Sequence, residues 1–226
     1  MKSQVRRARS KEGERSPRQR TPRGTVNRER VVGAALRAIE GGRYESMTIR
    51  SIAAELGVAP MTIYRHVRSR DELLDDVADV VLARNWRAKT DHEEWRPWLV
   101  GATTRFRQIL VDYPAVLNVY LRHPVESPAA IARMQEMIAH LKSAGFDEQG
   151  AVEAYAALHT YTIGFAALEA SRSHWFAQHR ETTNAVRDQL ASFATRDQFT
   201  TGLNFILDGF EHVLLANSDK FDGARR

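Results

Sequence analysis

The chain has 226 residues, of which 43% are apolar, 33 are Lys or Arg, 28 are Asp or Glu, and none is cysteine. This length suffices for a buried core in one or two domains, and the lack of cysteine excludes disulfide scaffolds, thiol catalysis and cysteine-ligated metal sites. No apolar run follows the basic first residues, and the longest uncharged stretch, 154–168, has only 15 residues, so we expect a cytoplasmic protein without a signal peptide or a membrane helix.

The net charge of +5 is unevenly distributed, because residues 1–30 carry eleven basic and three acidic side chains. Arginine is mixed there with Ser, Gln, Gly and Pro and with almost no apolar residue, a composition that cannot offset the entropy lost on ordering. We therefore expect residues 1–24 to be a disordered basic tail. Two roles stay open for this tail, a solubilising segment and an arm that contacts phosphates.

Beyond the tail the apolar residues recur at helical spacing, and no strand-like alternation is sustained, so an all-α fold is predicted. Four helices are expected in an N-terminal domain that comprises residues 25–87. Their bounds follow from apolar stripes, capping residues and glycine or proline stops: residues 31–39, residues 48–56 capped by Thr48, residues 60–67 with Pro60 in the first turn, and a fourth helix opened by Ser69 and Glu72.

Residues 88–217 are expected to form a second helical domain, followed by a short tail at 218–226. The polar segment 89–94 marks the junction between the two domains. Helices are predicted from Trp98 to the Tyr113-Pro114 pair, from Ser127 to Gly145, over about 147–171 and over about 196–216. Residues 174–195 have the least regular pattern, and we expect a loop with a short helix there.

Residues 48–67 have the composition of two short helices that cross closely. Ala53 is small enough for the crossing, Gly57 permits a tight turn, and apolar residues hold the second helix down. No acidic residue occurs in 56–70, whereas three Arg and one His do, so the exposed side suits a polyanion. The pattern predicts a helix-turn-helix that inserts residues 60–66 into the major groove of DNA. Ordinary helical hairpins use the same residue types, so spacing alone leaves that alternative open.

Residues 47–74, MTIRSIAAELGVAPMTIYRHVRSRDELL, resemble the signature of the tetracycline-repressor (TetR) family of transcriptional regulators. The most specific part is the T-hydrophobic-Y-x-H-hydrophobic core at residues 62–67. A weaker similarity, FTTGLNFILDGFE at residues 199–211, is to the last helix of one subgroup of regulatory domains in that family. The resemblance implies a three-helix DNA-binding domain and a C-terminal ligand-binding and dimerisation domain. The implied function is that of a repressor that binds a palindromic double-stranded DNA operator as a homodimer and is released by a small-molecule effector.

Carried over position by position, the family's DNA contacts fall on eight residues. Arg50 can hydrogen-bond a guanine edge or a phosphate, while the hydroxyls of Thr62 and Tyr64 suit phosphate oxygens. A packing role for His66 and an exposed ion pair for Arg70 stay open as alternatives. The full set is Thr48, Arg50, Pro60, Met61, Thr62, Tyr64, His66 and Arg70.

Ala59 departs from the family pattern, because relatives often place Ser or Thr just before the recognition helix. Alanine cannot cap a helix, which costs about 1 kcal/mol. Pro60 limits this loss, because proline in the first turn has no N–H group that needs a partner.

The resemblance implies an effector pocket in the second domain, whose occupation would move the fourth helix and change the separation of two recognition helices. Apolar and aromatic side chains with a few polar tips are the candidates for its walls: Trp98, Phe106, Tyr120, Met134, Met137, Tyr155 and His159. Each of them has ordinary core packing as its alternative. No effector identity follows. We expect neither a cofactor nor a metal, since His174 and His179 lack a fitting carboxylate partner.

The resemblance also implies that the long helix and the last helix form a four-helix bundle with a second subunit. Small residues on the long helix permit close approach, and apolar residues on the last helix supply burial: Ala156, Ala157, Thr160, Gly164 and Ala167 on the former, and Leu203, Ile206, Leu207, Phe210 and Leu214 on the latter. Packing within one subunit is the alternative for both faces.

Two other classes of function are enzymes and ligand-sequestering or adaptor proteins. The cluster at residues 92–94 lacks a nucleophile or metal motif, and phosphate-binding glycine loops and the HExxH pattern are absent from the sequence, so an enzyme is not expected. A helical ligand-sequestering or adaptor protein with a non-functional DNA reader remains the alternative to the repressor.

Overall fold

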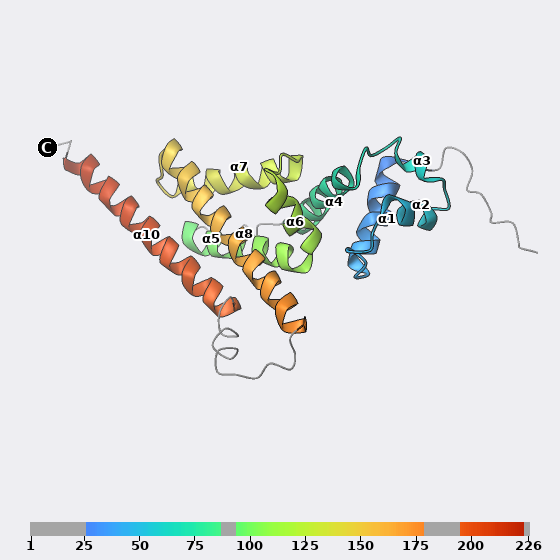
Figure 1. The fold of residues 1–226 in the computed structure, drawn as a ribbon. Coiled ribbons are helices and arrows are strands. Elements are labelled where there is room, and N and C mark those ends of the chain that lie inside the picture. Colours follow the sequence, from blue (N-terminus) through green and yellow to red (C-terminus); the bar gives the residue numbers. More distant parts are fainter. Residues whose placement is uncertain (1–25, 87–93, 179–194, 224–226) are drawn as a thin grey trace, which may run out of the picture.

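The computed structural model describes residues 26–86, 94–178 and 195–223, and within these ranges every regular element is a helix (Figure 1). The prediction of an all-α fold is confirmed for this part of the chain. The helices are α1 (Arg28–Glu40), α2 (Ile49–Glu55), α3 (Pro60–Ile63), α4 (Arg70–Asn85), α5 (Trp95–Asp112), α6 (Pro114–Arg122), α7 (Pro128–Ser143), α8 (Glu148–Gln178) and α10 (Arg196–Gly223).

Side-chain caps fix the starts of the N-terminal helices. Thr48 accepts a hydrogen bond from the backbone N–H of Ser51, whose hydroxyl accepts one from the N–H of Thr48, so the two close a capping box on α2. The Ser69 hydroxyl accepts from the N–H of Glu72 at 3.1 Å and caps α4. Ala59, in contrast, makes no side-chain cap on α3. These starts agree with the sequence predictions.

Two helices differ from the predictions. Helix α3 ends at Ile63 rather than near Val67. The N–H of His66 bonds to the Ile63 carbonyl only three residues back, and residues 64–66 form turns before Val67, which is buried in the core. Helix α6 was not predicted. Pro114 ends α5 as expected, but it also occupies the first turn of α6, where its fixed φ and missing N–H suit a helix start.

Predictions for several segments fall beyond the described residues. These are the tail at 1–24, most of the junction at 89–94 and most of the irregular stretch at 174–195. Helix α8 continues to Gln178 and α10 to Gly223, both further than the apolar patterns indicated.

Helix α4 lies at the centre of the larger hydrophobic core. Leu73, Leu74, Val77 and Leu82 are almost completely buried, and the same core continues from α1–α3 on one side to α5, α6 and α8 on the other. Figure 1 shows α4 between the α1–α3 end of the molecule and the helices of the second part. A second core cluster joins α5, α7, α8 and α10. Within the described ranges no helix has the length and apolarity needed to cross a bilayer.

The faces of α8 and α10 agree only partly with the predicted dimer surface. Ala156, Ala157, Thr160 and Gly164 on α8 are exposed, as that prediction requires. On α10, however, Leu203 and Leu207 are fully buried in the second core cluster of the same chain. The exposed apolar side chains of α10 lie on another stripe: Phe205, Val213 and Leu215.

Candidate nucleic-acid interface and effector cavity

Helices α2 and α3 form the close crossing that the sequence predicts. Gly57 connects them with φ of 68°, a conformation that side-chain-bearing residues rarely adopt. The N–H of Val58 donates to the carbonyl of Ala53 at 3.0 Å, which closes the turn. Ala53 is buried at the crossing together with Ile52. The local sequence therefore fixes the direction in which α3 leaves the domain.

The recognition segment, which we define as residues 60–66, has one buried side chain among exposed and half-buried ones. Ile63 is fully buried and anchors the segment to the core, as does Val67 just beyond it. Met61 is 72% exposed and Tyr64 is 48% exposed, although both are large side chains that normally gain from burial. Pro60 is also exposed. The residues predicted to meet DNA thus stand outside the core.

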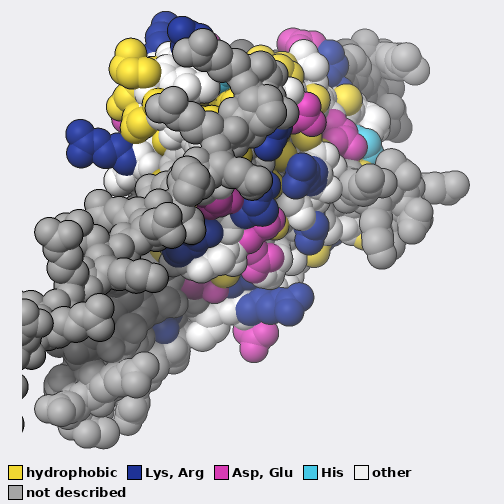
Figure 2. Space-filling view, turned by 90° about the vertical axis from the view of Figure 1, so that its right-hand side faces the viewer, with side chains coloured by type: hydrophobic (Ala, Val, Ile, Leu, Met, Phe, Trp, Pro, Cys, Tyr) yellow, Lys and Arg dark blue, Asp and Glu magenta, His cyan; other side chains and the backbone are white. Residues whose placement is uncertain are grey.

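Basic side chains accompany the recognition segment. Arg50 on α2 and Arg65 are exposed, and neither forms an ion pair with any residue that the structure describes. Figure 2 shows the end of the molecule at which α1–α3 lie in Figure 1, with Lys and Arg side chains projecting from a face that also carries Asp and Glu. Residues 56–70, which include no Asp or Glu, are therefore a short segment suited to phosphates. The surface around them carries charges of both signs (Figure 2).

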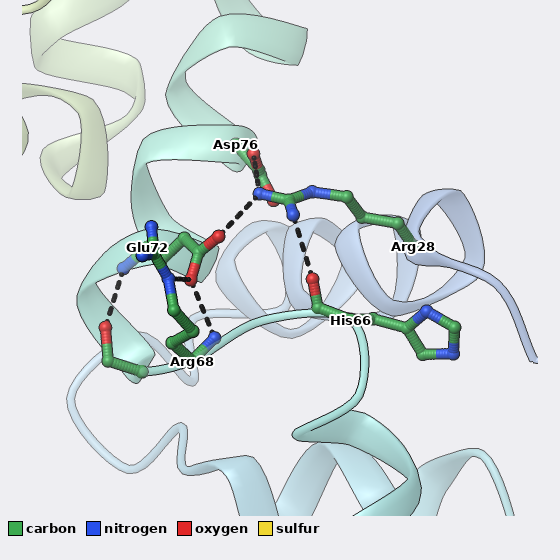
Figure 3. A network of polar contacts seen from close by, with 6 residues as sticks. Arg28, His66, Arg68, Glu72 and Asp76 are labelled. Carbon is green, nitrogen blue, oxygen red and sulfur yellow. Dashed lines mark hydrogen bonds and ion pairs between the residues drawn. The ribbon is translucent and has the colours of Figure 1, made fainter.

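A polar network holds the end of the recognition segment (Figure 3). Arg28 donates to the carboxylate of Asp76 at 2.8 and 2.9 Å, to Glu72 at 3.0 Å and to the backbone carbonyl of His66 at 2.9 Å. Glu72 also accepts from the backbone N–H of Arg68 at 2.7 Å. These bonds join the start of α1 to α4 and to the chain that follows the segment.

The same network sets the charge of Glu72 and the direction of His66. Hydrogen bonds from the N–H and the guanidinium of Arg68, followed by one from Arg28, lower the pKa of Glu72 to about 2. Glu72 is thus an anion that neutralises cations inside the network. In Figure 3 the imidazole of His66 points away from these bonds, which involve only its carbonyl. The ring is therefore available for the predicted phosphate contact.

Arg70 is arranged differently from the other candidate DNA contacts. Its guanidinium donates to the carbonyls of Met47 and Tyr44 at 3.0 and 3.1 Å and lies 5.1 Å from the centre of the Tyr44 ring. This side chain holds the loop before α2 in place, rather than forming the exposed ion pair considered as an alternative. Its contact with DNA stays a prediction.

A small internal cavity lies between α5, α7 and α8, beside the end of α4. Its free volume is about 10 Å³, enough for little more than one water molecule. Four of the seven predicted pocket residues line it: Phe106, Met137, Tyr155 and His159. Tyr120 packs against two of these, with its ring centre 5.3 Å from that of Phe106 and 5.6 Å from that of His159.

Tyr120 itself is not a lining residue, and two further predicted pocket residues lie away from the cavity. Trp98 is buried in the other core cluster and stacks on His140 with ring centres 3.5 Å apart. Met134 is partly exposed on α7 and is not among the lining residues. Both were chosen for their residue type, which does not distinguish a cavity wall from ordinary core.

Sequence reasoning missed Trp86, Thr103, Thr162 and above all Arg133 among the lining residues. Arg133 is only 2% exposed, although arginine is rarely buried. A signal was present, since Ala130, Arg133, Met137 and Leu141 follow one another at helical spacing and form the buried stripe of α7. Arg133 therefore stands at a core position.

Arg133 makes its polar contacts with neutral groups. One terminal nitrogen is 3.1 Å from the Tyr155 hydroxyl and 3.2 Å from Nδ1 of His159. Because guanidinium only donates, Nδ1 must be the unprotonated ring nitrogen. Burial, and secondly the nearby charge of Arg133, lower the pKa of His159 to about 4, so this imidazole is neutral at pH 7.

Polar contacts connect α4 to the cavity and to α6 and α7. The Trp86 indole N–H donates to the Glu136 carboxylate at 2.7 Å. The Asp79 carboxylate accepts from the N–H of Ala129 at 2.9 Å, and Arg122 forms ion pairs with Asp71 and Asp75. Trp86 in the cavity wall and the carboxylates of the Arg28 network thus belong to the two ends of one helix, α4.

Comparison with known proteins supports both parts of this arrangement. Residues 31–77 match the family "Bacterial regulatory proteins, tetR family", and residues 88–214 match "Tetracyclin repressor-like, C-terminal domain". The Escherichia coli tetracycline repressor protein class C is 31% identical over 212 residues, which cover 86% of this chain and 94% of that protein.

Solved structures share the fold. The TetR family protein ActR of Streptomyces coelicolor, in complex with actinorhodin, superposes with a TM-score of 0.68 at 20% identity and covers 84% of this chain and 99% of its own. BioQ with its double-stranded DNA operator gives a TM-score of 0.64 at 24% identity, over 82% and 98% of the two chains.

Proposed function

The chain belongs to the tetR family of bacterial regulatory proteins, and on that premise we propose that it is a repressor that binds a palindromic operator as a homodimer and releases it when an effector fills the cavity beside Trp86. Members of this family are transcriptional regulators and not enzymes. One observation carries the proposal: Met61 and Tyr64 stand exposed on a recognition segment that buried Ile63 anchors. Because a bacterial operator lies in the cytoplasm, we propose that the protein acts there.

The predicted DNA contacts on α2 and the recognition segment divide into two kinds. Arg50 is long enough to read a guanine edge or to hold a phosphate, and Met61 suits a thymine methyl group. Tyr64, Thr62 and the imidazole of His66 offer donors to phosphate oxygens, which fix the position of the protein on the duplex without reading its sequence. Base reading thus rests on Arg50 and Met61.

The homodimer would form across α8 and α10. Leu168 and Phe205 are exposed and flank an open groove of about 620 Å³, which Tyr161 and Phe165 also line. Exposed apolar side chains gathered in this way mark protein–protein contacts. A second copy related by twofold symmetry buries the same groove on both subunits, and the small residues on α8 let the helices approach. The stripe of Phe205 and Val213 replaces Leu203 and Leu207 as the contact of α10.

Release follows from the size of the cavity. At about 10 Å³ it admits no organic effector unless its walls move apart. Trp86 is a wall residue at the end of α4, so an effector that displaces it shifts α4 and, through Asp76 and Arg28, the recognition segment. Two recognition helices must match half-sites about 34–36 Å apart, and a small shift of each subunit disturbs that match.

Selection of bound fragments from genomic DNA by the purified full-length protein is the direct test, with sedimentation to establish the dimer. We expect a palindromic consensus. If the dimer neutralises about 6–10 phosphates, its affinity should fall by roughly 10³ to 10⁵ between 50 and 200 mM salt.

Failure to bind any DNA at low ionic strength would refute the proposal that this protein is a repressor. A dimer that takes up small molecules but no DNA would instead support the ligand-sequestering or adaptor protein.

A further inference from the structure

We propose that the effector is an aromatic carboxylate and that Arg133 binds its carboxylate group. This inference rests on the proposed function, because it assigns a ligand chemistry to the same cavity. The feature that carries it is a guanidinium that lines the cavity and is buried without an anion from the described chain.

The charge of Arg133 is unusual for its surroundings. Arginine keeps its proton in proteins, so a side chain that is 2% exposed brings a full positive charge into the core. Buried charges are normally paired, because removing them from water is costly. Here the hydrogen-bond partners are the neutral Tyr155 hydroxyl and the neutral His159 ring, and Nε of Arg133 has no acceptor within the described residues.

Arg107 is a buried arginine that does not line the cavity, and it serves as a comparison. It is 4% exposed, and its guanidinium forms an ion pair with the carboxylate of Glu169 at 2.6 Å. Its cationic group also lies over the Phe199 ring. Nε has no hydrogen-bond partner in either arginine, but of these two only Arg133, which lines the cavity, also lacks an ion pair within the described residues.

The nearby carboxylates on α4 and α7 have other partners. Glu136, one turn from Arg133, accepts the indole N–H of Trp86 at 2.7 Å. Asp79 accepts the backbone N–H of Ala129 at 2.9 Å. No ion pair joins either of them to Arg133 among the described residues, and Nε of Arg133 has no acceptor there, so the guanidinium retains donors that match the two oxygens of an external carboxylate, a pairing that is stronger than hydrogen bonds between neutral groups.

The rest of the cavity suits a flat aromatic body. The guanidinium carbon of Arg133 lies 3.9 Å from the centre of the Phe106 ring, with the Trp86 and Tyr155 rings at 5.6 and 5.8 Å. Thr103 adds a buried hydroxyl that lacks a partner among the described residues. Met137 is flexible and can repack around a ligand. An aromatic carboxylate would stack on these rings and give the guanidinium its anion.

The test compares two probes of nearly equal shape, 2-naphthoate and 2-naphthamide, titrated calorimetrically into the full-length wild-type protein. We expect the carboxylate to bind about 10 to 100 times more tightly than the amide. In Arg133→Met this preference should disappear, and in Arg133→Lys, which keeps the charge but not the planar fork, it should be intermediate.

The control is the double variant Arg107→Met/Glu169→Gln, which removes the other buried arginine together with its partner and should keep the preference of the wild type. Circular dichroism verifies that each variant is folded. Equal affinity for the two probes, no binding of 2-naphthoate, or a preference that survives Arg133→Met would overturn the inference.

Genomic DNA selection with the same preparations separates this result from the proposed function. A protein that selects DNA but shows no carboxylate preference refutes only the ligand chemistry. A protein that prefers 2-naphthoate through Arg133 but selects no DNA refutes the repressor.

Discussion

The same substitution at the two buried arginines should have different effects on stability. In Arg107→Met the carboxylate of Glu169 loses its cation. Breaking a buried pair costs about 3–5 kcal/mol, and because the Glu169 side chain is 23% exposed we expect a smaller loss, about 2–3 kcal/mol. The free energy of unfolding should fall by that amount.

In Arg133→Met no anion of the described chain is left without its partner. The variant loses two hydrogen bonds to neutral acceptors, about 1 kcal/mol each, and a cation–π contact with Phe106 of up to about 2 kcal/mol. The variant also gains stability, because it no longer buries an unpaired guanidinium, which costs the wild type several kcal/mol. These terms nearly cancel, so the stability of Arg133→Met should equal or exceed that of the wild type.

Urea unfolding of both variants and the wild type at pH 7 and at one protomer concentration measures the difference, which we expect to be about 2–3 kcal/mol or more with an unchanged m value. A fixed protomer concentration matters because subunit association contributes to stability. A loss in Arg133→Met as large as that in Arg107→Met would refute the reasoning, because it would mean that the chain itself supplies an anion to Arg133.

Three further predictions concern other parts of the molecule. The pKa of His159 is about 4 in the folded protein and about 6.5 in the unfolded chain, so between these pH values the unfolded state binds one more proton. The free energy of unfolding should therefore fall by up to about 3 kcal/mol as the pH drops from 6.5 to 4. A His159→Gln variant that keeps the full decline would contradict this. Ala59→Ser should raise the free energy of unfolding by at most about 1 kcal/mol without weakening DNA binding, and the gain should be small because the N–H of Thr62 already bonds to the Ala59 carbonyl; a lower melting temperature would refute the capping argument. Tyr64→Ala should weaken binding to all sequences while stability stays within about 0.5 kcal/mol, whereas Arg50→Ala should also relax sequence preference; unchanged operator affinity in both, measured by fluorescence anisotropy, would disprove the contact assignment.

The parts of the fold that local chemistry controls could be predicted. Thr48 and Ser69 mark helix starts because a capping side chain bonds to an N–H only a few residues away. Helix α6 was missed because Pro114 can both end one helix and begin the next. The end of α3 was missed because Ile63 and Val67 keep helical spacing even though the chain turns between them.

The candidate site was predictable to a different extent in its two parts. The recognition segment is a short continuous stretch, so its residue types and its lack of acids are visible in the sequence. The cavity is assembled from Trp86, Arg133 and His159, which lie far apart in the chain, and no local pattern states which core residues border a void. The link between Arg28 and Asp76 likewise spans 48 residues.

The continuous core around α4 restricts how this protein could exchange parts with its relatives. A chimera joined at residue 87 would separate Leu73, Val77 and Leu82 on α4 from α6 residues of the same core, such as Val116 and Val119. The hybrid would then have poorly matched apolar surfaces between α4 and α6, and part of this apolar surface would be exposed to water. A functional hybrid would have to transfer α6 together with α1–α4, or have the contacting residues of α4 and α6 redesigned together.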